Sequence, residues 1–243
     1  MKMPQPQSLA PHEQHPLFEQ NPVLLSKIGP ALHKKTFRHG EAVFTHGDDA
    51  AHLWLVFRGW VKLTRQTPDG KESIVGLCTE RDVFGEATLF AGASYPYTAE
   101  IVGDDAELAS LPAAQLRALV AEQPQLSSRI MSMLSERMAQ AQLKLEHMNT
   151  MSAAQRLGCF LLRLCYTQAD GAKTLHIPIE KNVLATYLGM KPETLSRSQQ
   201  QIKPLGIQVR GAMIQIDNIA RLREFVCGSC SESGNCDVED AAS

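Results

Sequence analysis

The sequence predicts an α+β protein in which an N-terminal antiparallel β-roll is followed by a long helix and a C-terminal winged helix-turn-helix. Glycine and turn residues recur between short apolar runs from about residue 30 to residue 110. Apolar residues then recur at intervals of three and four, and two short amphipathic segments joined by a glycine precede a hairpin-like run. With 243 residues, of which 44% are hydrophobic, the chain can build two modest cores.

We divide the chain into five parts. Residues 1–16 are polar and proline-rich and lack the apolar segment of a secretory signal, so we expect a flexible leader. The roll is expected over 17–124, the long helix over 125–151 and the winged helix-turn-helix over 152–226, before an acidic, cysteine-containing tail over 227–243. No run approaches the roughly 18 apolar residues of a membrane span, so we expect a cytoplasmic protein that does not enter membranes.

Four runs are expected to be strands of the roll: Ala42–Thr45, His52–Phe57, Trp60–Arg65 and Ser73–Leu77. Glycines separate the runs, and the third alternates apolar and polar side chains as a half-buried strand does. The Thr-Pro-Asp-Gly sequence at Thr67–Gly70 should close a hairpin, because proline and glycine set the backbone of a tight turn. Many short strands with regular turns indicate a small antiparallel roll.

Two helices are predicted after the roll, a short one over 113–122 and a long one from Gln125 to Met151. Apolar residues of the long helix have coiled-coil spacing and form the predicted dimer interface: Ile130, Leu134, Met138, Ala141, Leu145 and Met148. The remaining positions include Arg129, Glu136, Arg137, Gln140 and Lys144, whose polarity favours a dimer. A helix packed on its own domain is the alternative.

The predicted C-terminal domain comprises helix Ala153–Tyr166, helix Glu180–Leu188, a helix that begins at Pro192, and a two-stranded wing over Gln208–Ile216. Proline suits the first turn of a helix, and Glu193 beside it interacts favourably with the helix dipole. Pro204 and Gly206 should end this helix. Two helices joined by a glycine-containing turn and followed by a hairpin are typical of a winged helix-turn-helix.

The first turn of the third helix carries side chains suited to reading DNA in the major groove. Arginine bonds guanine in two places, glutamate accepts from cytosine, and serine can bond either way. Residues 180–210 contain five Lys or Arg against two Glu, although the whole chain has a net charge of −2. The predicted DNA contacts are Lys191, Glu193, Thr194, Ser196, Arg197 and Gln200. A generic exposed helix is the alternative.

Four segments resemble the Crp/Fnr family of transcription regulators, and the resemblance covers roughly residues 17–226. They are the roll segments 40–48, 53–63 and 84–86 and the helix-turn-helix segment 188–197. The resemblance implies a cyclic-nucleotide-binding-like roll and a homodimer that binds double-stranded DNA and contacts RNA polymerase. No nucleophile elbow, phosphate-binding loop or dinucleotide fingerprint is present, so no enzyme is expected.

The DNA-reading motif is similar to that of the Fnr branch, in which serine precedes the arginine, as Ser196 precedes Arg197. This implies a TTGAT-type half-site in an inverted repeat, with Glu193 and Arg197 reading a G·C pair and Ser196 a thymine. Pro192 before Glu193 is similar to the Dnr/Nnr regulators of denitrification.

Cyclic-nucleotide sensors of this family hold the phosphate with an arginine that follows a Gly-Glu pair. Here the pair is Gly85–Glu86, and Tyr97 stands where the arginine is expected. A buried phosphate without a charge partner would be costly. We therefore expect no cAMP binding, with Gly85 and Glu86 as structural residues of the roll.

Three cysteines near the end of the chain, Cys227, Cys230 and Cys236, have the spacing C-x2-C-x5-C. The spacing is similar to the iron–sulfur ligands of Fnr proteins, moved to the other end, and thiolates are suitable ligands for a [4Fe–4S] cluster. Such clusters usually take four ligands. Candidates for the fourth are Glu146, His147, Cys159 and Cys165. Zinc binding, a dithiol switch between Cys227 and Cys230, or an incidental tail are alternatives.

Haem is the competing cofactor, because the Dnr-like proteins are thought to sense nitric oxide with it. Its candidate ligands are His12, His15, His33 and His52, and no CxxCH attachment site is present. Oxygen, nitric oxide and redox state are thus all possible signals. A rival from another class is an iron–sulfur redox protein that uses the roll only as a scaffold and binds no specific DNA.

Overall fold

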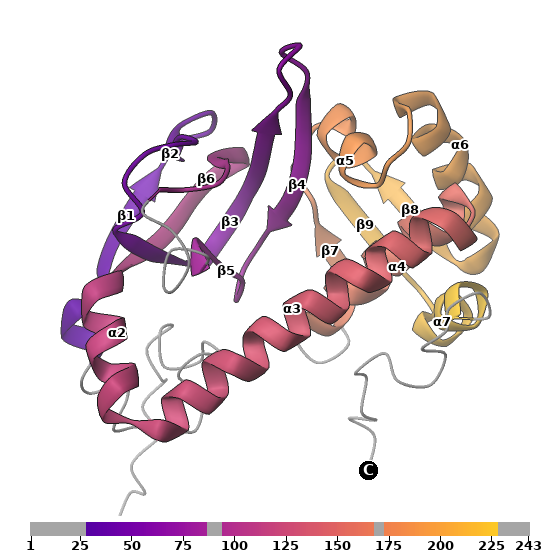
Figure 1. Cartoon of the computed structure of the whole chain (residues 1–243). Helices are drawn as coiled ribbons and strands as arrows, with labels where there is room; N and C mark the ends of the chain where they lie inside the picture. Colours follow the sequence, from indigo (N-terminus) through magenta and orange to yellow (C-terminus); the bar gives the residue numbers. More distant parts are fainter. Residues whose placement is uncertain (1–27, 87–93, 168–172, 228–243) are drawn as a thin grey trace, which may run out of the picture.

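The computed structural model describes residues 28–86, 94–167 and 173–227, which form two domains joined by one long helix (Figure 1). The first domain contains a six-stranded antiparallel sheet in the order β1-β6-β3-β4, with β2 paired to β6 and β5 to β3. This arrangement confirms the predicted α+β class and the antiparallel roll. The strands are β1 His33–Phe37, β2 Ala42–Phe44, β3 His52–Gln66, β4 Glu72–Cys78, β5 Val83–Phe84 and β6 Thr98–Pro112.

Strand β3 continues through Gly59, so the prediction of two strands, His52–Phe57 and Trp60–Arg65, was wrong: they are one bent strand. Gly59 has a φ of 97°, and the register with β6 shifts on both sides of Arg58. A Cβ added to Gly59 would lie 2.6 Å from the Cβ of Ala106 on β6. The glycine therefore permits a bend at a close approach of two backbones.

The turn predicted at Thr67–Gly70 connects β3 to β4. The Thr67 backbone N–H donates to the Lys71 carbonyl at 2.9 Å, and the Gly70 N–H donates to the Thr67 carbonyl at 2.9 Å. Strand β6 was not assigned from the sequence, although it pairs with β1, β2 and β3 and so connects most of the roll. Strand β6 is long and follows the bend of β3, whereas the strands predicted from the sequence are short apolar runs separated by turns.

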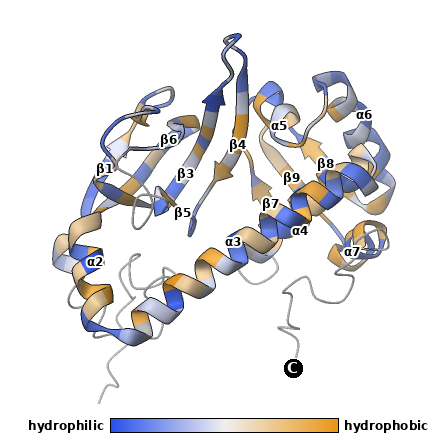
Figure 2. Ribbon diagram, viewed as in Figure 1, coloured by the Kyte–Doolittle hydropathy of each residue, from blue (hydrophilic) through white to orange (hydrophobic). Residues whose placement is uncertain are grey.

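The two helices that follow the roll lie where the sequence predicted them. Helix α2 spans Ala113–Glu122, and α3 spans Pro124–Thr150, one residue earlier at each end than expected. Proline at the first turn of α3 costs no hydrogen bond there. Helix α3 runs from the roll to the second domain (Figure 1), and hydrophobic and hydrophilic residues alternate along it (Figure 2).

The second domain consists of α4 Ala153–Thr167, β7 Thr174–His176, α5 Lys181–Tyr187, α6 Pro192–Ile202, β8 Ile207–Arg210, β9 Met213–Ile216 and α7 Ile219–Cys227. The predicted helices and wing are present, and β7 joins the wing to make a sheet in the order β7-β9-β8. Strand β7 and helix α7 were not predicted. Helix α7 packs closely on α4, because a Cβ on Gly158 would lie 2.7 Å from a methyl group of Val226.

The two domains share one hydrophobic core. Trp60, Leu77 and Val102 of the roll are buried in the same cluster as the apolar residues of α4, including Phe160. The ring centroids of Trp60 and Phe160 are 6.4 Å apart. Motion of the second domain against the roll must therefore rearrange buried side chains. None of the described helices is long and apolar enough to cross a membrane.

Candidate functional site

Helix α6 has a buried face and an exposed face. Leu195, Ser198 and Ile202 are buried toward α4 and α5, which both contact α6. The opposite face is open to solvent and carries most of the predicted DNA contacts: Lys191, Glu193, Arg197 and Gln200 are all exposed. Because helical spacing separates the two sets, the domain core fixes the helix while leaving this polar face free to enter a groove.

The other two predicted contacts are less accessible. Thr194 and Ser196 are half-buried, and the Ser196 hydroxyl donates to the Pro192 carbonyl at 3.2 Å. Lys191 has an extended backbone, with φ of −78° and ψ of 153°, so the helix begins immediately after it. All six predicted contacts therefore lie at the start of α6 or within its first nine residues, and the exposed ones point away from the domain.

Two exposed cations near the recognition helix, Arg210 on the wing and Lys203 directly after α6, were not selected by the sequence analysis. Arg210 is exposed at the end of β8, directly before Gly211, whose φ of 60° permits the turn to β9. Its guanidinium donates to the side-chain oxygen of Gln208 at 3.0 Å. Lys203 is exposed just after α6. Arg210 could have been selected from the sequence, because it is a basic residue beside the glycine of the predicted wing turn. Basic residues at such positions suit contacts with DNA phosphates, which position DNA-binding domains.

The outer side of α3 carries an apolar stripe, but its first member differs from the prediction. Ile130 is 1% exposed and is buried with Leu116 and Leu126 in the chain's own core, so it is unavailable to a second copy. Leu134 is half-buried against the same core. Met131, beside Ile130, is exposed in its place. We define the outer apolar stripe as Met131, Met138 and Leu145, which are exposed and do not line the cavity described below. The predicted interface residues Ala141 and Met148 are also exposed, but they line that cavity, and the Met148 side chain lies over Gly189 of the second domain.

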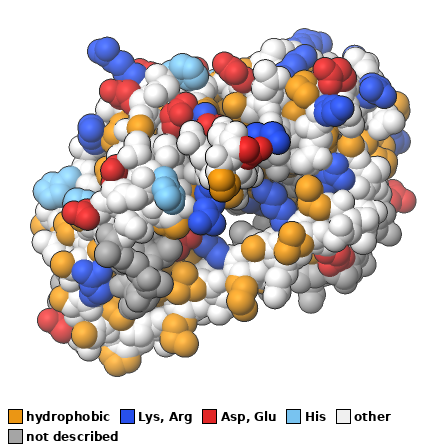
Figure 3. Space-filling view, turned by 45° about the horizontal axis from the view of Figure 1, so that its top comes forward, with side chains coloured by type: hydrophobic (Ala, Val, Ile, Leu, Met, Phe, Trp, Pro, Cys, Tyr) orange, Lys and Arg blue, Asp and Glu red, His pale blue; other side chains and the backbone are white. Residues whose placement is uncertain are grey.

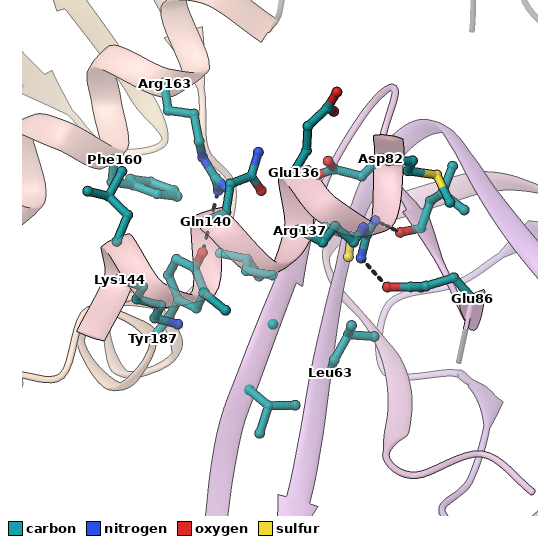
Figure 4. Close-up of a pocket in the computed structure, with 18 of the residues that line it drawn as sticks. Leu63, Asp82, Glu86, Glu136, Arg137, Gln140, Lys144, Phe160, Arg163 and Tyr187 are labelled. Atoms are coloured by element: carbon teal, nitrogen blue, oxygen red, sulfur yellow. Dashed lines mark hydrogen bonds and ion pairs between the residues drawn. The ribbon is translucent and has the colours of Figure 1, made fainter. Parts of the chain in front are cut away.

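The inner side of α3 faces a cavity of about 930 Å³ between the roll, α3 and the second domain (Figure 4). The polar residues that favoured a dimer from the sequence line this cavity: Arg129, Glu136, Arg137, Gln140 and Lys144. Their polarity therefore does not distinguish the two alternatives. Helix α3 packs on its own chain through one face and exposes an apolar stripe on the other.

The space-filling view shows Lys and Arg side chains around a hollow in the surface (Figure 3).

At the roll end of the cavity, Arg137 of α3 pairs with Glu86 at 2.6 Å and also donates to the Val83 carbonyl. Tyr97 accepts a hydrogen bond from the Gly85 backbone N–H at 2.8 Å. Burial, and then the charge of Glu86, raise the pKa of Tyr97, so the phenol stays neutral. Helix α3 thus supplies a cation that the roll segment lacks, and Glu86 engages it. The absence of cAMP binding stays a prediction.

The predicted metal ligands are only partly described. Cys227 is half-buried at the end of α7, whereas Cys230 and Cys236 lie outside the described residues. Within residues 28–86, 94–167 and 173–227, no three His, Cys, Asp or Glu side chains are grouped so that they could hold a metal ion. A cluster at this end of the chain would therefore depend on the two cysteines beyond α7.

The candidates for the fourth ligand occupy different environments. His147 is 8% exposed, and its Nδ1 lies 3.8 Å from the Sγ of Cys159, so these two candidates contact each other. Glu146 is half-buried on α3. Cys165 is fully buried, and burial raises its pKa to about 11. A protonated thiol is a poor ligand, which counts against Cys165.

The described haem-ligand candidates lie away from the cavity. His33 is exposed at the start of β1, and His52 is half-buried with its ring 6.2 Å from that of Trp54. Neither is part of the cavity lining, which contains His147 instead. His12 and His15 lie outside the described residues.

Comparison with known families matches both domains. Residues 34–123 match the cyclic nucleotide-binding domain, and residues 155–225 match the Crp-like helix-turn-helix domain. The chain is 30% identical over 168 residues to the global nitrogen regulator of Nostoc sp., which covers 67% of this chain and 75% of that protein. It is 24% identical over 205 residues to a CRP-like cAMP-activated global transcriptional regulator of Mycobacterium tuberculosis, covering 83% and 91%.

A solved structure has the same overall arrangement. A regulatory protein of Silicibacter pomeroyi DSS-3, proposed to bind cAMP, superposes with a TM-score of 0.66 and 31% identity, covering 84% of this chain and 89% of that chain. The roll, the long helix and the exposed recognition helix thus occur together in proteins related in sequence over most of their length. The chain therefore belongs to the Crp/Fnr family of DNA-binding transcription regulators.

Proposed function

We propose that the protein binds, as a homodimer, to an inverted repeat of TTGAT-type half-sites and regulates transcription through contacts with RNA polymerase. Two α6 helices related by a two-fold axis would enter major grooves one helical turn apart. The outer apolar stripe of α3 would supply the dimer contact, because a row of exposed apolar side chains is expected to be covered. Such a regulator would act in the cytoplasm, and no catalytic activity is required of it.

The observation that carries this proposal is the exposed polar face at the start of α6. Glu193 and Arg197 are four residues apart, so they lie side by side on this face and can address one base pair. Arginine and glutamate together suit a G·C pair, since one recognises guanine and the other the cytosine amino group. Lys203 and Arg210 flank the helix with positive charge suited to phosphates.

The test is to replace Arg197 by Ala and measure binding to a duplex that carries two TTGAT half-sites. We expect the binding free energy to fall by about 1–3 kcal/mol. We also expect the variant to discriminate less well against half-sites in which the G·C pair is replaced by another base pair. Arg221→Ala is the matched control, because Arg221 is an exposed arginine on α7 of the same domain. Equal affinity of Arg197→Ala and the control for this duplex would refute the proposal, as would sequence-independent binding by the unmodified protein.

We propose further that Cys227, Cys230 and Cys236 hold an iron–sulfur cluster, [4Fe–4S], through which oxygen, nitric oxide or redox state controls DNA binding. Two features support this. Cys227 is half-buried rather than freely exposed, and it ends a helix that packs on α4, the first helix of the DNA-binding domain. His147 and Cys159 lie on α3 and α4, so a fourth ligand from this pair would connect the tail to the junction of the domains.

The cluster is tested by anaerobic purification followed by iron and sulfide analysis and visible spectroscopy. We expect about four irons and four sulfides per chain, lost when Cys227, Cys230 or Cys236 is replaced by Ser. Zinc without sulfide, a haem spectrum, or a colourless protein that anaerobic reconstitution leaves unchanged would each refute it. A cluster in a protein without specific DNA binding would instead support the iron–sulfur redox protein.

A further inference from the structure

The end of the cavity next to the DNA-binding domain brings two cations onto one tyrosine. Lys144 comes from α3, Arg163 from α4 and Tyr187 from α5, and all three line the cavity (Figure 4). The Lys144 Nζ lies 3.9 Å from the centroid of the Tyr187 ring, and the Arg163 guanidinium donates to the Tyr187 hydroxyl at 3.5 Å. We call these three residues the cationic end of the cavity.

The charge of the cavity is positive although the chain as a whole is acidic. Six Lys or Arg line it (Arg81, Arg129, Arg137, Lys144, Arg156 and Arg163) against three Asp or Glu (Asp82, Glu86 and Glu136), an excess of three positive charges. The whole chain has a net charge of −2. The low-dielectric walls of a cavity strengthen the positive electrostatic potential inside it. The excess of positive charge should therefore attract anions from solution.

Lys144 experiences this excess directly. Burial, and then the positive charge of Arg163, lower the pKa of the Lys144 ammonium. Among the described residues no carboxylate forms an ion pair with Lys144, and its Nζ lies over the face of the Tyr187 ring. Asp82 offsets part of the charge of Arg163, but its carboxylate accepts a hydrogen bond from the Thr79 backbone N–H at 2.8 Å within the roll. Within the described part of the chain, the Lys144 ammonium can therefore take an anionic partner.

We propose that the cationic end binds the carboxylate or phosphate group of a small organic anion. Lys144 and Arg163 would bond the anionic oxygens, and the apolar side of the cavity, which includes Leu143 and Phe160, would cover the body of the ligand. A volume of about 930 Å³ is within the range of small-molecule sites. This site is separate from the roll end of the cavity, where Glu86 already engages Arg137.

The position of the cationic end couples such a ligand to DNA binding. An anion held there would join α3 to α4 and α5, and both of these helices contact α6. It would thus favour one placement of the recognition helix relative to the dimer helix, which sets the spacing of the two half-site contacts. This coupling, unlike anion binding itself, rests on the proposed function.

The experiment measures anion binding in the absence of DNA. Isothermal titration of the full chain with inorganic phosphate and, separately, with glutarate at matched ionic strength distinguishes a phosphate from a carboxylate ligand. We expect saturable binding of one probe, weakened about ten- to a hundredfold by Lys144→Met. Lys71→Met is the control, because Lys71 is an exposed lysine on the β3–β4 hairpin, paired with Asp69. It should leave binding unchanged.

Folding is checked by the melting temperature without added anion. Lys144→Met should melt at or above the temperature of the unmodified protein, since it removes repulsion from Arg163 and keeps the apolar stem. The proposal is overturned if neither probe binds saturably, or if Lys144→Met melts normally and binds as tightly as Lys71→Met. Anion binding that leaves the affinity for TTGAT DNA unchanged would keep the site and overturn only its coupling. If the unmodified protein binds the anion but does not bind TTGAT DNA specifically, that result would count against the proposed function and not against the anion site.

Discussion

At the scale of single residues, Gly59 shows how one position sets the path of a strand. Its φ of 97° lies in the region that side chains with a Cβ avoid, and the backbone of Ala106 is within 2.7 Å of where a Cβ would sit. The bend lets the second half of β3 reach the DNA-binding domain, where Trp60 contributes to the shared core. The glycine is thus needed for conformation and for space.

Gly59→Ala should lower the free energy of unfolding by more than Gly70→Ala does. Gly70 has a similar φ of 80°, but nothing lies within 4 Å of a Cβ added there. The Gly70→Ala variant therefore measures only the cost of placing a residue with a Cβ in the left-handed region, about 1–2 kcal/mol. The Gly59 variant pays this cost and must also displace the Ala106 backbone. Urea denaturation of both variants measures the difference, and equal losses would show that the close approach is unimportant.

Arg137 shows a residue whose role the sequence could not indicate. Its helical position assigned it to the polar side of α3, away from the apolar stripe. The structure places its guanidinium on Glu86 and on the Val83 carbonyl, so it fastens α3 to the roll. Since Glu86 lies 51 residues earlier in the chain, no local pattern connects the two.

At the scale of elements, α3 performs two tasks with two faces. Its inner face supplies three of the six cations that line the cavity, Arg129, Arg137 and Lys144, and its outer face carries the outer apolar stripe. Met131, Met138 and Leu145 are each more than 60% exposed, with values of 68%, 62% and 66%. A helix that exposes so many large apolar side chains in one line is expected to pair with a second helix.

Met138→Glu should dissociate the homodimer. A two-fold interface would bring two such carboxylates close together in apolar surroundings, at a cost on the order of several kcal/mol. Sedimentation velocity should show a shift from dimer to monomer, with weaker binding to the inverted repeat. Ala139→Glu is the control, because Ala139 is exposed on α3 but lies outside the stripe. A dimer that survives Met138→Glu and not Ala139→Glu would place the interface elsewhere.

At the scale of the whole molecule, the two domains are joined by a continuous core and by a cavity. Trp60 and Val102 of the roll pack with residues of the DNA-binding domain, and Gly103 lets the backbone approach the Pro178 carbonyl. A Cβ on Gly103 would lie 2.6 Å from that oxygen. Such contacts make the relative position of the domains respond to whatever fills the cavity, since packed interfaces shift between discrete arrangements.

The sequence by itself determined the fold class, the order of the elements and the recognition helix. These features depend on local signals: turn residues between strands, three-and-four spacing in helices, and proline and glycine at the ends of α6. The bounds of α2 and α3 agree with prediction within one residue for the same reason. Glu193 and Arg197 could be proposed as DNA contacts because helical position and side-chain chemistry are both local properties of the sequence.

Only the tertiary structure decided which residues meet across the chain. It joined two predicted strands into β3, buried Ile130 in the chain's own core, and turned the polar side of α3 toward a cavity. It also brought Lys144, Arg163 and Tyr187 together from three helices. These outcomes depend on long-range packing and on charges that become neighbours only after folding. A periodic pattern specifies which face of a helix is apolar, but the surrounding elements determine what each face contacts.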